Sequence, residues 1–117
     1  MKKVLIVDND TILVDILNLT MDFYGLNLIH VDDHNEIDLI LEKNFVSVVI
    51  CDVMLTGIDM IAKAQEIKNK KMIPVIMIGI RELSAEEGKK LFCSKIPFIR
   101  KPVEPNVLIE KVRELIQ

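Results

Sequence analysis

The sequence predicts an α/β protein with a doubly wound parallel sheet, and three observations favour this class. Short runs rich in Val and Ile alternate with longer segments at helical spacing along all 117 residues. Hydrophobic residues make up 50% of the chain but aromatic residues 4%, so aliphatic side chains must fill the core. The connections are a few residues long. Five strand–helix repeats in this length predict one domain over residues 1–117, with strand order 2-1-3-4-5.

The first half of the chain is predicted to hold three strands and two helices. Residues 4–7 form a continuous apolar run, which is typical of a parallel strand covered on both faces. Apolar residues at helical spacing predict a helix over 11–24, with Asp10 as its N-cap and Gly25 as its terminator. The next segments are predicted as strand, helix and strand, over 26–29, 35–43 and 46–51.

The second half is predicted to continue the same alternation. A helix over 58–69 follows the turn at Thr56-Gly57, and a strand over 74–78 begins at a proline. Ser84 and Glu87 form a capping-box pattern that opens a helix reaching about residue 93. The last strand and helix are predicted over 96–99 and 105–116.

Composition excludes several classes of function. The net charge of -3 and the scattered basic residues argue against a nucleic-acid surface. The longest nearly apolar stretch, 45–55, is well short of the ~20 residues that span a bilayer. The basic start is not followed by a signal-peptide core, so we expect a cytoplasmic protein. Cys51 and Cys93 lack metal or redox spacing and are predicted to be buried free thiols.

Three of the predicted strands end at, or shortly before, a residue that can bind phosphate or a metal ion: Asp8, Asp52 and Lys101. Because the carboxyl ends of parallel strands meet at one edge, two carboxylates and an ammonium are expected in one pocket. An ionised carboxylate such as Asp52 can attack an activated phosphorus without a general base. The developing charge would then be neutralised by Lys101 and by a hard cation such as Mg²⁺ bound to the carboxylates.

At these residues the chain resembles the receiver domain of two-component response regulators, over essentially its full length. The resemblance rests on 4–8, on 52–55 with Gly57 and Asp59, and on 98–102. It implies a flavodoxin-like fold and a signalling module rather than an enzyme. It also implies that Asp52 accepts a phosphoryl group, that Asp8, Asp52 and the Met54 carbonyl hold Mg²⁺, and that Lys101, before a cis proline, binds the phosphoryl oxygens. Phe98 corresponds to the switch aromatic.

The resemblance further implies the partners. These are a sensor histidine kinase or phosphotransferase and a downstream protein target, with the chain itself a monomer or weak dimer. Neither nucleic acid nor membrane is an expected partner.

Two departures from the family pattern affect this reading. Asn9 stands where a second acidic metal ligand is usual, so Mg²⁺ is expected to bind weakly, with the Asn9 amide oxygen as a remaining ligand. Gly79 replaces the switch hydroxyl residue, and the bulky Ile80 that follows is expected to crowd Asp52. Both departures favour a shallow switch.

Alternatives remain open from the sequence. A degenerate receiver that docks proteins without phosphorylation fits the same departures, and we favour the working phosphoacceptor because Asp52 is retained. A haloacid-dehalogenase-type phosphatase is suggested by Asp8-Asn9-Asp10-Thr11 but is disfavoured, because no acidic pair follows Lys101 in this chain and the chain is short for that family. A flavin-binding flavodoxin-like module is disfavoured, because the loop after the first predicted strand lacks a Ser/Thr/Gly-rich phosphate cradle and aromatic residues for ring stacking are scarce. Asp10 is expected to be a helix cap, Phe98 either a switch or a packing residue, and His30 and His34 surface residues.

Overall fold

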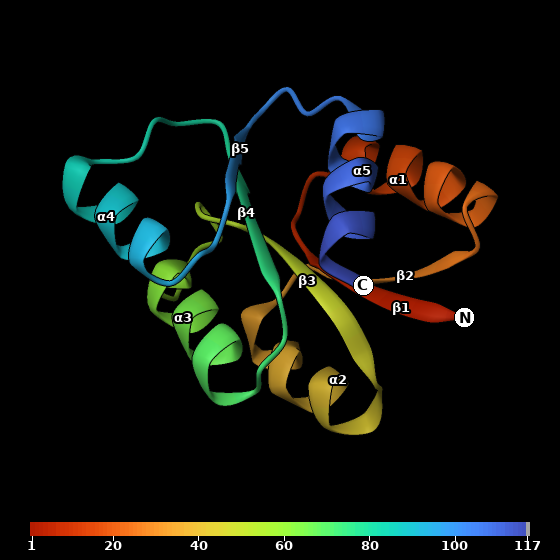
Figure 1. The fold of residues 1–117 in the computed structure, drawn as a ribbon, viewed down its shortest axis with the longest axis horizontal. Helices are drawn as coiled ribbons and strands as arrows, with labels where there is room; N and C mark the ends of the chain where they lie inside the picture. The colour runs from red at the N-terminus through yellow and green to blue at the C-terminus, as the bar shows by residue number, and fades with distance from the viewer. Residues whose placement is uncertain (117) are drawn as a thin grey trace.

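The computed structural model describes residues 1–116 and arranges them as alternating strands and helices (Figure 1). The strands are β1 (Lys2–Val7), β2 (Leu26–Val31), β3 (Val46–Asp52), β4 (Val75–Gly79) and β5 (Phe98–Arg100). The helices are α1 (Thr11–Phe23), α2 (Ile37–Lys43), α3 (Met60–Lys70), α4 (Ala85–Cys93) and α5 (Pro105–Ile116). A 3₁₀ turn at His34–Glu36 precedes α2.

The five strands are parallel and lie in the order β2-β1-β3-β4-β5, which confirms the predicted topology. The strand order reverses between β1 and β3, where Val7 pairs with Cys51. Asp8 and Asp52 follow directly on these paired residues. The topology therefore places both carboxylates at the carboxyl edge of the sheet, at its switch point.

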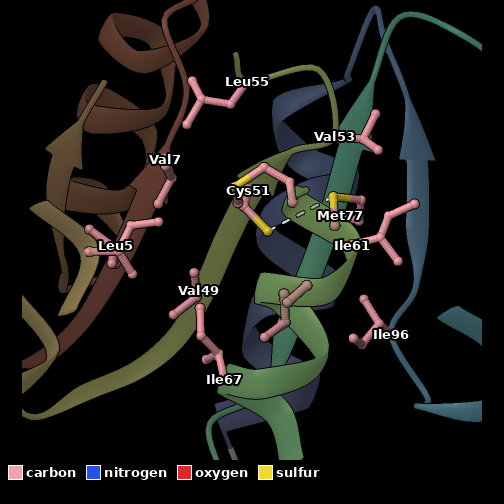
Figure 2. Packing of buried hydrophobic residues seen from close by; sticks show 14 of the residues in the cluster. Leu5, Val7, Val49, Cys51, Val53, Leu55, Ile61, Ile67, Met77 and Ile96 are labelled. Atoms are coloured by element: carbon pink, nitrogen blue, oxygen red, sulfur yellow. Dashed lines mark hydrogen bonds between the residues drawn. The ribbon is translucent and has the colours of Figure 1, made fainter. Parts of the chain in front are cut away.

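Side chains alternate along each strand between two buried layers. In β1, Val4 and Ile6 belong to the layer under α1 and α5, whereas Leu5 and Val7 belong to the layer under α2 and α3. Figure 1 shows α1 and α5 together on one face of the sheet. Figure 2 shows the other layer, in which Cys51 and Met77 from neighbouring strands lie with their sulfur atoms 3.9 Å apart. The apolar runs are thus covered on both faces, as predicted.

Local capping signals position three of the helices. The Asp10 side chain accepts a hydrogen bond from Leu13 N at the start of α1, and Asp59 does the same for Ala62 N at the start of α3. Ser84 forms the predicted capping box with Glu87 at the start of α4. Gly25 lies just past α1 with φ +71°, a conformation that favours glycine.

Some sequence-based expectations were wrong. The last strand covers Phe98–Arg100 rather than 96–99, because Ile96 N donates to Leu91 O and caps the end of α4. α3 begins at Met60, two residues later than predicted, since Asp59 is its cap. Cys93 is exposed on α4, whereas Cys51 is buried as expected.

The structure divides the methionines between core and surface. The buried ones are Met21, Met60 and Met77, and the exposed ones are Met1, Met54 and Met72.

Helix length gives a further result. None of the helices in residues 1–116 has the length and apolar character that crossing a bilayer requires.

Candidate functional site

Asp8, Asp52 and Lys101 meet at the carboxyl edge of the sheet, although they are far apart in the sequence. Lys101 Nζ lies 2.9 Å from Asp52 Oδ2 and 3.1 Å from Asp8 Oδ2. The Lys101 side chain is 10% exposed, so the three groups form a largely buried ion-pair cluster. The convergence expected from the strand ends is therefore present.

Lys101 reaches this cluster across the end of β4, which lies between β3 and β5 in the sheet. The Lys101 backbone N–H donates to Gly79 O at 2.9 Å, which fixes the turn after β5 against the last residue of β4. The Lys101-Pro102 peptide bond is cis, as the sequence resemblance implied. The end of the short strand β4 thus leaves room for the lysine side chain.

Asp8 is fully buried, and its two oxygen atoms have different surroundings. Oδ1 accepts hydrogen bonds from Asp10 N at 3.0 Å and from Lys101 Nζ at 3.4 Å, whereas Oδ2 is buried without a hydrogen bond of good geometry. Lys101 Nζ is close to Oδ2, but its direction makes the contact an ion pair rather than a hydrogen bond. Burial raises the pKa of Asp8 above its ordinary value, despite the opposing Asp10 and Lys101 contacts.

Asp52 accepts a hydrogen bond at each of its two carboxylate oxygens. Its Oδ1 accepts from Met54 N at 2.8 Å and its Oδ2 accepts from Lys101 Nζ. Burial alone would lower the pKa of Lys101, but the hydrogen bonds to Asp52 and Asp8 raise it above its ordinary value. Lys101 therefore stays charged and holds one Asp52 oxygen in a fixed direction.

Asp10 has a role that the sequence did not indicate. The expected cap is present through Oδ1, and in addition Asp10 Oδ2 lies 3.3 Å from Lys101 Nζ. The Leu13 backbone N–H and, less strongly, Lys101 hold the pKa of Asp10 below its ordinary value. Its position two residues after Asp8, at the N-cap of α1, was the signal available in the sequence.

The other predicted metal ligands are less constrained. Asn9 is exposed, and Met54 is half exposed, with its backbone N–H bonded to Asp52. Within residues 1–116 no group of three or more His, Cys, Asp and Glu side chains is arranged around a common metal position. A hard cation that keeps several waters still fits, because Asp8 Oδ2 is an oxygen donor without a hydrogen bond.

The space around Gly79 is tightly packed, which the sequence did not indicate. Val53 Cγ1 lies 2.6 Å from the point where a Cβ on residue 79 would stand, and Phe98 Cε1 lies 3.5 Å from it. Phe98 is partly buried against the core at this place. A hydroxyl side chain at position 79 would therefore not fit without a rearrangement, because Val53 occupies the space that it would need. Ile80, expected to crowd Asp52, is 66% exposed.

His30 supports the site from the edge strand. Its imidazole N–H donates to the backbone carbonyl of Asp8, with Nε2 and O 2.7 Å apart. His30 is exposed, as the sequence predicted, and the parallel pairing of β2 with β1 brings its ring to the Asp8 carbonyl.

The cavities lie mostly away from this cluster. A cavity of about 580 Å³ lies at the opposite edge of the sheet between Phe45, Met72 and Pro74. A smaller one of about 280 Å³ is lined by Asp10, Ile12 and Lys101, at the corner of the acidic cluster. The smaller hollow is the one that adjoins the charged cluster, because the Lys101 ammonium and the Asp10 carboxylate line it.

A family model described as the response regulator receiver domain matches residues 4–113. Solved structures give the same fold. A CheY-like receiver domain protein from Methanospirillum hungatei is 24% identical with a TM-score of 0.86, covering 99% of this chain and 94% of that one. The receiver domain of the Francisella response regulator 1452 is 20% identical with a TM-score of 0.84, covering 99% and 97%.

A third likeness is to the chemotaxis response regulator CheY4 of Vibrio cholerae. It is 21% identical with a TM-score of 0.81, and the alignment covers 98% of each chain. At these identities the structural likeness establishes the arrangement of strands and helices, and residue roles must be argued from the site.

Proposed function

Since the chain belongs to the response regulator receiver domain family, we propose that it is the phosphoacceptor module of a two-component phosphorelay, with Asp52 as the acceptor. The observation that carries this proposal is the Lys101 ammonium 2.9 Å from Asp52 Oδ2. A fixed cation beside a carboxylate at a strand end is what acceptance of a phosphoryl group needs. We propose that residues 1–117 act as one such domain, as a signalling module rather than as an enzyme.

The proposed phosphoryl transfer follows from the surroundings of the two Asp52 carboxylate oxygens. An Asp52 oxygen forms the new P–O bond while the bond from phosphorus to the donor's histidine nitrogen breaks, and that nitrogen keeps the electron pair. Lys101 stands where it can pair with a phosphoryl oxygen, and the Met54 N–H orients the carboxylate. Positioning and charge stabilisation supply the catalysis, since no general base is required.

Mg²⁺ would add a second cation at the same place. We propose that Asp8, Asp52, the Asn9 amide oxygen and the Met54 carbonyl hold it. The hydrogen-bond-free Asp8 Oδ2 supports this assignment, and the neutral Asn9 supports weak binding.

The exposed face of α1 supports docking of a phosphodonor protein. Four large apolar side chains at helical spacing form what we call the α1 stripe: Ile12 at 72%, Ile16 at 43%, Leu19 at 77% and Phe23 at 84% exposure. The stripe begins beside the hollow at Asp10 and Lys101. We propose that a histidine kinase or phosphotransferase contacts it, with a separate downstream protein receiving the signal.

A second candidate function is a docking module that needs no phosphorylation. The packing of Val53 and Phe98 around Gly79 favours it, because the usual hydroxyl has no place there. The acceptor reading is preferred, since this packing leaves the Asp52–Lys101 contact intact.

Incubation with acetyl phosphate and Mg²⁺ tests the acceptor. We expect the intact mass of the parent to increase by one phosphoryl group that hydroxylamine removes. Asp52→Asn should show no increase. Asp59→Asn is the matched control, because it makes the same chemical change at the cap of α3 and should behave as the parent. An unmodified parent would favour the docking module.

A further inference from the structure

Lys101 is surrounded by three carboxylates, and the third, Asp10, has no part in the proposed transfer. We propose that Asp10 is a positioning residue: it holds the Lys101 ammonium toward α1 and takes a share of the charge that would otherwise stabilise a phosphoryl group on Asp52. This inference deepens the proposed function and rests on it.

The contact distances show how the ammonium is shared. Lys101 Nζ lies 2.9 Å from Asp52, 3.1 Å from Asp8 and 3.3 Å from Asp10. An ammonium has three N–H donors, so three carboxylates are enough to occupy all of them. A phosphoryl group on Asp52 must therefore compete for Lys101 with two other acids.

Asp10 differs from the other two acids in its place and its bonding. Its side chain is 37% exposed, against 0% for Asp8 and 10% for Asp52, so it lies at the rim. Its two oxygens divide the work: Oδ1 caps Leu13 N at 3.1 Å and Oδ2 faces Lys101. Asn at position 10 would keep the cap, because Asn caps helices as well as Asp, but would remove the charge.

The charge of Asp10 has a predictable effect on transfer from a small donor. An Asp52 oxygen bonds to the phosphorus of acetyl phosphate while the P–O bond to acetate breaks, and acetate leaves with the electron pair. The three outer phosphoryl oxygens stay negative and need Lys101. Removing the Asp10 charge should therefore speed phosphorylation, by about fivefold for one charge a few ångströms away in a partly solvated site.

The experiment compares the parent, Asp10→Asn and the matched cap control Asp59→Asn by two readouts. The first is the rate of phosphorylation by acetyl phosphate at fixed Mg²⁺ and ionic strength. The second uses unphosphorylated protein and ¹H–¹⁵N spectra to measure how fast the Lys101 ammonium hydrogens exchange with solvent. Thermal unfolding of each variant checks that the α1 cap is intact.

In Asp10→Asn we expect several-fold faster exchange of the Lys101 hydrogens and about fivefold faster phosphorylation, with Asp59→Asn unchanged in both. Unchanged Lys101 exchange in Asp10→Asn would overturn the positioning role, whether or not the protein is phosphorylated. Faster exchange with an unchanged or slower phosphorylation rate would overturn the sharing of charge. A parent that accepts no phosphoryl group is the failure of the proposed function, and it leaves the exchange measurement to decide the positioning role.

Discussion

The Val53 side chain fills the space beside Gly79: its Cγ1 lies 2.6 Å from the position of a Cβ on residue 79, nearer than real side-chain atoms approach. Both residues are buried: Val53 comes directly after β3, Gly79 is the last residue of the neighbouring β4, and Val53 N donates to Ile78 O. The absence of a side chain at Gly79 and the position of the Val53 side chain therefore depend on each other.

This arrangement predicts that Gly79→Thr alone is destabilising. Overpacking a tight core site costs about 1–3 kcal/mol of unfolding free energy, and here Val53 must move. Adding Val53→Ala should recover much of the loss, which urea unfolding of the single and double variants measures. Gly88→Ala is the control, since nothing lies within 4 Å of that added Cβ and the helix α4 should gain about 0.5–1 kcal/mol. If Gly79→Thr and Gly88→Ala behaved alike, the steric account would be wrong.

Asn9→Asp should bind Mg²⁺ more tightly than the parent. A second carboxylate beside Asp8 adds one negative charge to the proposed cation site, and we expect about a tenfold lower dissociation constant. Titration calorimetry measures it, and the shift of the unfolding temperature with Mg²⁺ provides a second readout. Equal affinities for the two proteins would contradict the weak-binding hypothesis.

Glu87 should make the stability of the protein depend on acid pH. Its pKa is lowered from 4.5 to about 2, first by the Arg81 side chain and then by the Ser84 N–H. A lowered folded-state pKa stabilises the protein above the unfolded value, and this contribution is lost as the pH falls from about 4.5 toward 2. Glu87→Gln keeps a capping side chain but loses the ion pair.

We therefore expect the parent to have a higher urea midpoint than Glu87→Gln at pH 7. The difference should shrink as the pH is lowered through that window. A difference in midpoint that stays constant from pH 7 to pH 2.5 would show that the charge of Glu87 has no part in stability.

The α1 stripe predicts a separation between protein and small-molecule donors. Ile12→Ser and Leu19→Ser change exposed side chains, so the unfolding free energy should stay within about 0.5 kcal/mol of the parent. Transfer from a phosphorylated histidine phosphotransferase domain should slow, whereas the rate with acetyl phosphate should not change. Phe92→Ser is the control, because Phe92 is equally exposed on α4. Equal transfer rates for all variants would place the docking surface elsewhere.

Much of the site could be predicted because its residues stand at strand ends. Apolar runs that stop on Asp8 and Asp52 lead to one sheet edge whenever the strands are parallel and adjacent. The bond of His30 to the Asp8 carbonyl could not be predicted in this way, because β2 is an edge strand and its register with β1 decides which side chain reaches Asp8.

The sequence by itself determined the order of the elements, most of their caps and the identity of the acidic and basic residues at the sheet edge. These are local properties, since hydrophobic period, capping side chains and turn residues act over a few positions. The tertiary structure alone decided that Val53 fills the place beside Gly79 and that Asp10 shares Lys101. Both depend on atoms from different strands and helices approaching within a few ångströms, and packing of the whole domain sets such distances.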